Sequence, residues 1–233
     1  VKKIIQRSLV NHYTFIQEHP QYVCLLSESY KERLEEYCDL PDNYFISIPN
    51  PNTYENIEII PHKEPILLFV GRLDNRSKKL FTLIDIWYRL CKLYPQWKLI
   101  IVGDGPDKDV NKAKDISNIE FKGYQDPREY YEKASIFCMT SIFEGFPMCL
   151  TEAMQFGCVP VAFDSFSAVY DIIKPGETGE LVKSFDKKEY VGKLIHLIDD
   201  ETYRKKLSKN AFQYVKRYDI ANILPKWIEL IEK

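Results

Sequence analysis

The sequence predicts an α/β fold, a doubly wound parallel sheet of about six strands with helices on both faces. From residue 66 onward, short apolar runs rich in β-branched residues alternate with helical patterns. The runs are apolar throughout, as strands buried on both faces of a parallel sheet are. We therefore expect strands at residues 66–70, 98–102, 119–121, 135–140, 159–163 and 180–182.

The segments between these runs have helical patterns of their own. A helix is expected over residues 79–94, because its apolar residues fall on one face, namely Leu80, Leu83, Ile84, Trp87 and Cys91. Gly157 fits a helix C-cap, and residues 175–179 fit a turn. Residues 186–233 are helical in pattern, and Pro225 is expected to interrupt them before a final helix.

Residues 1–60 follow a different pattern. Strands are expected at residues 22–26 and 45–48, with a helix between them that a capping box opens at Ser29. Two strands cannot form a stable α/β domain alone, so this part is either the remnant of a preceding domain or an added edge of the main sheet. The residues 49–56, rich in proline and asparagine, mark the boundary. The chain thus divides into 1–60, a main domain at 61–217 and a C-terminal helix at 218–233.

Composition and charge exclude several functions. The 233 residues carry 32 basic and 34 acidic side chains, and the net charge of −2 provides no electrostatic surface for nucleic acid. No apolar run approaches the roughly 20 residues of a membrane-spanning helix, so no transmembrane segment is expected. The chain does not begin with Met, which fits a piece of a longer protein.

Cysteine and histidine spacing predicts neither a metal site nor a disulfide framework. No Cys-x-x-Cys pair occurs, and we expect free, buried thiols in a reducing cytosol at Cys24, Cys38, Cys91, Cys138, Cys149 and Cys158. The histidines lie apart from any Ser or Cys nucleophile signature and are interpreted as surface or packing residues: His12, His19, His62 and His196.

The most informative segment begins at Glu144, directly after a predicted buried strand. Gly145 would let the backbone bend, and Pro147 suits the first turn of a helix, where a missing N–H costs nothing. The free amides of residues 148–151 would then face an anion, since a helix start carries roughly half a positive charge. Glu152 would lie roughly 6 Å along the helix axis from Met148. Its carboxylate could accept hydrogen bonds from both hydroxyls of a ribose. The alternative is a solvated helix with ordinary surface glutamates.

Further candidates follow the other predicted strands, at the edge where open α/β sheets bind ligands. Gly71 and Arg72 follow the first strand, and Lys78 and Lys79 begin the next helix. An Arg and a Lys in one crevice could neutralise a diphosphate leaving group, although surface solubility is an alternative for either Lys alone.

The second and third strands end in glycine-containing loops. Gly103, Asp104 and Gly105 follow the second strand, and these glycines would permit close backbone approach to a ligand or form only a turn. Gly123 and Tyr124 end the third strand and could present backbone groups and an aromatic edge to a base.

Competing motifs are weaker. Gly103 and Gly105 lack the third glycine of a dinucleotide fingerprint, and no Gly-x-x-x-x-Gly-Lys-Ser/Thr loop for nucleoside triphosphates occurs. Asp107 and Asp109 form an Asp-x-Asp pair, a pattern that can hold a metal ion. The pair lies in a polar loop, and chance occurrence accounts for it in a chain with 28% charged residues.

In its motifs the chain resembles the C-terminal, donor-binding domain of the group 1 (family 4) glycosyltransferases, which are retaining enzymes of the GT-B architecture with two Rossmann-like domains. The similarity runs from about residue 65 to residue 218. It passes through Gly71-Arg72-Leu73, Lys78, Gly103-Asp104-Gly105-Pro106, Gly123, Glu144-Gly145-Phe146-Pro147, Glu152-Ala153-Met154, Gly157-Cys158-Val159-Pro160 and Gly176-Glu177-Thr178-Gly179.

The resemblance implies roles for individual residues. Arg72 and Lys78 would bind the donor diphosphate and Glu144 the donor sugar, as the catalytic set. The base would lie near Tyr124, and Glu152 would bind the ribose. No metal or other cofactor is expected, because protein cations would neutralise the diphosphate. The donor-binding set comprises Gly71, Lys79, Gly103, Asp104, Gly123, Tyr124, Gly145, Phe146, Pro147, Met148, Cys149, Leu150, Thr151 and Glu152.

Three departures from the family pattern matter. The loop 74–77 is about one residue longer than expected, which leaves open whether Lys78 or Lys79 contacts phosphate. Phe166 and Ser167 stand where family members often carry glycines. The N-terminal acceptor-binding Rossmann domain is almost wholly absent, although residues 1–60 look like its last piece and the helix at Trp227 resembles the one that packs back onto it.

The sequence therefore predicts transfer of a sugar, with retention, from a UDP- or GDP-sugar to a saccharide or lipid-linked acceptor. Polysaccharide assembly in the cytoplasm, peripheral to the inner face of the membrane, is the setting that the resemblance implies. Two alternatives stay open. One is a nucleotide-sugar binding module without transfer activity, because half of the cleft is missing. The other is a GT-B enzyme such as a nucleotide-sugar epimerase.

Overall fold

The computed structural model describes residues 22–35, 44–107, 113 and 115–232. Of the residues singled out above, His12, His19, Cys38 and Asp109 lie outside the described part.

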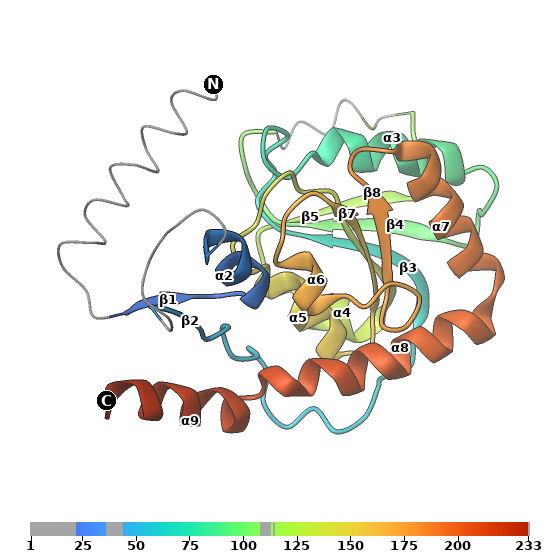
Figure 1. The fold of residues 1–233 in the computed structure, drawn as a ribbon. Coiled ribbons are helices and arrows are strands. Elements are labelled where there is room, and N and C mark those ends of the chain that lie inside the picture. Colours follow the sequence, from blue (N-terminus) through green and yellow to red (C-terminus); the bar gives the residue numbers. More distant parts are fainter. Residues whose placement is uncertain (1–21, 36–43, 108–112, 114, 233) are drawn as a thin grey trace, which may run out of the picture.

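A six-stranded parallel sheet forms the centre of the molecule (Figure 1). Its strands are β3 (Glu64–Val70), β4 (Lys98–Val102), β5 (Ile119–Gly123), β6 (Ala134–Met139), β7 (Val159–Asp164) and β8 (Glu180–Lys183). They lie in the order β5-β4-β3-β6-β7-β8, and all neighbours pair in parallel. The predicted doubly wound sheet is confirmed, and each strand begins and ends within two residues of its expected bounds.

Both faces of this sheet are buried. Leu67 and Phe69 belong to one apolar cluster, whereas Ile66 and Leu68 belong to the other, because alternate side chains along a strand reach opposite faces. Helices α3 (Leu80–Leu90) and α7 (Lys187–Asp199) cover the first cluster. Helices α4 (Arg128–Lys133), α5 (Met148–Gln155), α6 (Val169–Ile172) and α8 (Glu201–Val215) pack into the second.

Two helix predictions are confirmed in detail. The predicted apolar face of α3 is buried, with the Trp87 side chain fully enclosed. Helix α5 ends at the expected glycine: Gly157 has a φ of 77°, and its amide donates to the Met154 carbonyl over 2.9 Å. The Cys158 amide donates to the Ala153 carbonyl over 3.0 Å, which completes a Schellman motif.

The described N-terminal residues form a separate small unit and no added edge of the main sheet. Strands β1 (Val23–Leu25) and β2 (Phe45–Ser47) pair in parallel with each other only, and α2 (Glu28–Glu35) follows β1. The predicted cap at Ser29 is wrong, because α2 begins one residue earlier. The Tyr30 amide donates to the Ser27 hydroxyl over 3.4 Å, while the Ser29 side chain is bonded to Asp171 on α6.

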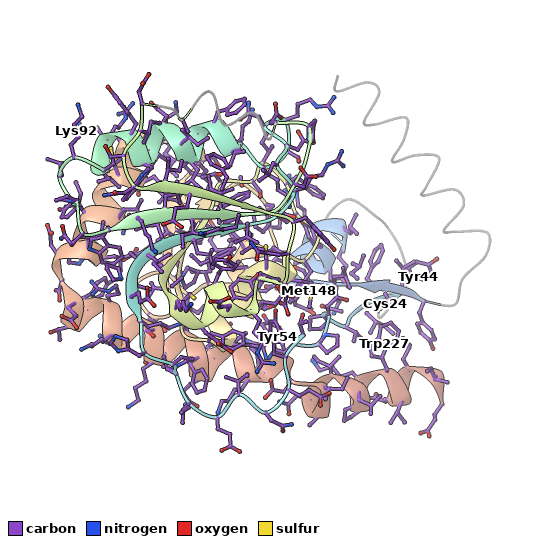
Figure 2. The ribbon with its side chains drawn as sticks, turned by 180° about the vertical axis from the view of Figure 1, so that it is seen from behind. Cys24, Tyr44, Tyr54, Lys92, Met148 and Trp227 are labelled. Atoms are coloured by element: carbon purple, nitrogen blue, oxygen red, sulfur yellow. The ribbon has the colours of Figure 1, made fainter. Side chains whose placement is uncertain are left out.

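The C-terminal helices differ from the expectation in one respect. The break lies at a 3-10 helix over Lys216–Tyr218, and Pro225 is inside α9 (Ile220–Ile231). The break falls there because Asp219 is extended, with ψ of 146°, whereas Pro225 costs α9 only one backbone hydrogen bond. Helix α9 reaches away from the large sheet toward β1 and β2 (Figure 1), and Trp227 lies at the same end of the molecule as Cys24 and Tyr44 (Figure 2).

The described cysteines are free thiols, as predicted. Cys91, Cys138 and Cys158 are buried, Cys149 is half-buried, and Cys24 is exposed. The expectation of burial is wrong for Cys24, because β1 belongs to a sheet of only two strands and this side chain points away from its covered face.

Candidate functional site

The predicted site residues lie at the carboxyl edge of the sheet, where the direction of winding reverses. Strands β3 and β6 are neighbours, but the chain leaves β3 toward β4 on one side and β6 toward β7 on the other. This reversal is the topological switch point of the sheet, beside which open α/β sheets bind ligands. The loops after the two strands contact each other here, since the Ile142 amide donates to the Ser77 carbonyl over 2.8 Å and the Thr140 hydroxyl donates to the Lys78 carbonyl over 2.8 Å.

An ion pair between Lys78 and Glu144 occupies this junction. The two side chains are only 21% and 13% exposed, so the pair is shielded from water. The Lys78 ammonium has three N–H donors and gives one to Glu144, which leaves two for oxygens of a ligand. Lys79 differs from Lys78, because it takes a left-handed backbone with φ of 53° at the start of α3.

The loop that carries Glu144 is held from the N-terminal unit. Tyr30 of α2 donates its hydroxyl to the Glu144 carbonyl, and its ring centroid lies 6.3 Å from that of Phe143. Arg33 of the same helix donates to the Ser167 hydroxyl over 3.3 Å. Helix α2 therefore fixes the backbone position from which Glu144 reaches Lys78.

The start of α5 agrees with the prediction in place but not in detail. Pro147 is the N-cap, with ψ of 95°, and the helix begins at Met148. The expected set of free amides is too large, because the Leu150 amide already donates to the Pro147 carbonyl over 3.0 Å. The amides of Met148 and Cys149, in the first turn, lack carbonyl partners within the helix and can receive an anion.

Several predicted donor-binding residues can contribute only their backbone. The side chains of Phe146, Pro147, Leu150 and Thr151 are buried beneath the loop and in the core. Gly145 is exposed, its φ lies outside the left-handed region and a Cβ would meet open space. The predicted need for glycine in this bend is therefore wrong.

The Cys149 thiol lies among the charges of this junction without being reactive. Burial raises its pKa to about 12, and the nearby Lys78 ammonium opposes that shift only in part. The side chain therefore stays a neutral thiol at pH 7. The charges of Lys78, Glu144 and Glu152 all act on this thiol.

Gly103 and Gly105 allow close approach, but of the protein to itself. A Cβ on Gly103 would lie 1.9 Å from the Gly71 carbonyl oxygen, and one on Gly105 would lie 2.4 Å from the Leu73 carbonyl oxygen. The Gly71 amide donates to Val102 and the Leu73 amide to Asp104. These glycines thus bring the loops after β3 and β4 together, while approach of a ligand to Gly103 stays a prediction.

Arg72 lines a cavity of about 650 Å³ at the ends of β3, β4 and β5. Gly71, Gly103, Asp104 and Tyr124 line it as well. Tyr124 is 90% exposed and free to meet a flat ligand, while the positive φ of 71° at Gly123 turns the chain into this wall. The structure thus places Arg72 with the predicted base-binding residues, and Lys78 with Glu144 and Cys149.

Glu152 is engaged by two hydroxyl groups. Its Oε2 accepts a hydrogen bond from the Tyr131 hydroxyl over 2.8 Å, and its Oε1 accepts one from the Thr53 hydroxyl over 2.7 Å. Neither partner was identified from the sequence. In the sequence, no local pattern distinguishes Tyr131 from its neighbour Tyr130, and Thr53 is one residue of the boundary segment. Both contacts with Glu152 depend on tertiary packing.

Two properties concern the described residues as a set. Nowhere in the described ranges do three or more His, Cys, Asp or Glu side chains gather as a metal site. None of the described helices is both long enough and apolar enough to cross a membrane.

A family comparison matches this part of the chain. The family of glycosyl transferases group 1 matches residues 52–214, which include both loops and all of the sheet. The chain belongs to the group 1 glycosyltransferases.

Two relatives of this chain carry names that describe a specific activity or pathway. An α-1,4-N-acetyl-D-galactosaminyltransferase of Campylobacter jejuni, named for a saccharide on diphospho-undecaprenol, is 32% identical over 173 residues, which are 72% of this chain and 48% of that protein. The amylovoran biosynthesis glycosyltransferase AmsD of Erwinia amylovora is 31% identical over 220 residues, 90% of this chain and 61% of that protein. The chain thus spans about half the length of the curated relatives it matches.

Solved structures agree with the fold. TarM of S. aureus, crystallised with UDP and saccharide ligands, matches with a TM-score of 0.82 at 24% identity, over 91% of this chain and 44% of TarM. The lipopolysaccharide galactosyltransferase WaaB in its apo form matches with a TM-score of 0.74 at 25% identity, over 91% of this chain and 61% of WaaB. The six-stranded sheet is therefore a GT-B half.

Proposed function

We propose that this chain carries the donor-binding half of a glycosyltransferase that moves a sugar from a UDP- or GDP-sugar to an acceptor with retention of configuration, as in family 4. The observation that carries the proposal is the shielded Lys78–Glu144 pair beside the first turn of α5. It combines a cation, a carboxylate and two first-turn amides at the switch point of the sheet in a group 1 chain. UDP in the TarM crystals supports the donor class.

The chemistry would be largely electrostatic. As the bond between sugar and diphosphate breaks, negative charge grows on the leaving phosphate, and Lys78, Arg72 and the Met148 and Cys149 amides would stabilise it. Glu144 would orient sugar hydroxyls and keep Lys78 in place. These cations would make a metal unnecessary. Retention is supported by the α linkage in the name of the C. jejuni relative, since an α-configured donor gives that product with retention.

The acceptor is proposed to be a saccharide or a lipid-linked saccharide, as the name of the C. jejuni relative indicates for that enzyme. A second Rossmann-like domain would supply the acceptor wall of the cleft, next to the unit formed by β1, α2 and β2. Action in the cytoplasm, at the inner face of a membrane, is part of the same proposal.

Calorimetric titration of the 233-residue chain with UDP and with GDP tests the donor class. We expect one of the two to bind with a Kd below about 1 mM, and Arg72→Ala or Lys78→Ala to weaken it. In a full-length enzyme, either variant should lower turnover by orders of magnitude. Absence of binding to both nucleotides would refute the proposal.

Because the chain matches only about half the length of its relatives, one second candidate is a binding module without transfer activity. A donor-turnover assay on the titrated sample separates the two. Binding without transfer from the sugar nucleotide to any offered saccharide favours the module, whereas transfer by this chain alone eliminates it.

A further inference from the structure

The Glu152 carboxylate is held by one rigid and one surface hydroxyl. Tyr131 approaches from α4 inside the fold, with its side chain 0% exposed. Thr53 approaches from the exposed segment that links the two units. Each bonds a different carboxylate oxygen, over 2.8 Å and 2.7 Å respectively. The carboxylate can therefore neither rotate nor swing without losing a charge-assisted hydrogen bond.

The Tyr131 ring is fixed by neighbouring aromatic rings. It stacks on Phe156 with centroids 6.1 Å apart and an interplanar angle of 13°. Tyr54 meets it edge-on at 6.3 Å, and Phe137 lies at 6.2 Å. A side chain packed in this way has one available rotamer, so its hydroxyl presents a fixed donor to Glu152.

The Tyr131 backbone is tied down as firmly. Its carbonyl accepts a hydrogen bond from the Lys63 ammonium over 2.8 Å and one from the Cys158 thiol over 3.2 Å. Burial raises the pKa of Tyr131 far above its ordinary value, so the hydroxyl is a protonated donor to Glu152 at neutral pH.

The carboxylate still has room for a ligand. A carboxylate offers about four acceptor positions on its two oxygens, and the two protein hydroxyls use one on each. One acceptor position per oxygen stays available, which matches the two adjacent hydroxyls of a ribose. Glu152 is half-buried, so its side chain keeps part of its surface accessible.

We propose that Tyr131 and Thr53 are positioning residues that hold the Glu152 carboxylate in the orientation that accepts both hydroxyls of the donor ribose. This inference rests on the proposed function, because it assumes that a ribonucleotide binds beside α5. Tyr131 contributes more to this orientation, since its side chain is buried and its ring is fixed. Thr53 contributes less, because it is exposed and water can replace its hydroxyl as a donor to Glu152.

Ribose and deoxyribose nucleotides test the proposal directly. The Kd values of UDP, dUDP, GDP and dGDP are measured by calorimetry for the wild-type chain, Tyr131→Phe, Thr53→Val and the control Tyr130→Phe. Tyr130 precedes Tyr131 on α4 and is half-buried, so this variant loses a hydroxyl in the same helix. Melting temperatures are recorded for each.

We expect the wild-type chain and Tyr130→Phe to prefer the ribonucleotide by about tenfold or more, as the loss of a hydrogen bond to a charged group predicts. Tyr131→Phe should reduce this preference to about threefold or less while its Kd for the deoxynucleotide changes less than about twofold. Thr53→Val should reduce the preference partly. If Tyr131→Phe fails to fold, Thr53→Val decides alone, because its position is exposed.

An unchanged preference in the folded variants would overturn the inference, as would equal weakening of both nucleotides, which a merely structural role predicts. Equal binding of the ribonucleotide and the deoxyribonucleotide of one base by the wild-type chain also overturns the inference, although the donor proposal survives that result. Failure of the wild-type chain to bind any of the four nucleotides refutes the proposed function itself.

Discussion

The Asp171 carboxylate accepts hydrogen bonds from both the amide and the hydroxyl of Ser29, over 3.2 Å and 2.6 Å. The Ser27 hydroxyl donates to the same carboxylate. Asp171 belongs to α6 in the sheet domain, whereas the serines begin α2 in the N-terminal unit. A residue distant in sequence thus provides the negative charge that a helix start favours, and it fixes the helix whose Tyr30 bonds the Glu144 carbonyl.

Asp171→Ala should release α2 and lower the free energy of unfolding by about 1–3 kcal/mol, because three donors lose a charged acceptor. Hydrogen exchange of α2 amides should accelerate more than exchange in the large sheet. Urea denaturation and exchange mass spectrometry measure both effects. Asp115→Ala, at an exposed loop position, is the control. Equal stability and equal α2 protection in the two variants would show that the Asp171 contact does not hold this helix.

Two glycines provide opposite expectations for the same substitution. Gly103→Ala should destabilise the fold by about 2–4 kcal/mol, because its Cβ would lie 1.9 Å from the Gly71 carbonyl oxygen and its φ is 142°. Gly192→Ala, inside α7 with open space around its Cβ, should stabilise the fold by about 0.5–1 kcal/mol. Thermal and urea denaturation test the pair, and a neutral Gly103→Ala would contradict the described contact.

Alkaline pH should destabilise the fold through buried thiols. Burial raises the pKa of Cys138 from 9.0 to about 12. Between these values the folded state keeps a proton that the unfolded chain has lost, so the free energy of unfolding falls as pH rises. The slope for one such group is at most about 1.4 kcal/mol per pH unit. Burial lowers the pKa of Lys63, and this group acts in the opposite sense below pH 10.5.

Cys138→Ala removes this titration while leaving the other thiols in place. Urea denaturation at pH 8, 9 and 10 should show a smaller pH slope for the variant than for the wild-type chain, whatever its absolute stability. Parallel slopes would mean that Cys138 ionises alike in both states.

Features that depend on local periodicity could be predicted from the sequence, whereas contacts between distant residues could not. The strands and the apolar face at Trp87 could be predicted, because periodicity along the chain determines which side chains a sheet or helix buries. The placement of Lys78 and Glu144 at one edge could be predicted from the rule that parallel strands end together. The contacts of Glu152 could not, because Thr53 and Tyr131 reach it through tertiary packing that no local pattern records.

Smaller errors have the same origin. Pro147 was expected inside the helix and is its N-cap. Gly103 was expected to approach a ligand or to form only a turn, and its close contact with the Gly71 carbonyl was not foreseen. Local propensity correctly marked a helix start and a turn at these positions, but the contact that requires glycine at position 103 comes from a residue elsewhere in the chain.

The claim at the centre of this account is that the Lys78 ammonium receives the diphosphate of the donor. Calorimetry with UDP, GDP, uridine and guanosine tests it on the wild-type chain, Lys78→Met, Lys79→Met and the control Lys92→Met. Lys92 is exposed and lies far from Met148 at the start of α5 (Figure 2). We predict that Lys78→Met weakens binding of the preferred nucleoside diphosphate by about 10- to 100-fold. Lys79→Met should weaken it less, and Lys92→Met should not change it. Binding of the nucleosides should be the same in all variants. Wild-type diphosphate affinity in Lys78→Met, or a larger loss in Lys79→Met, would contradict the account.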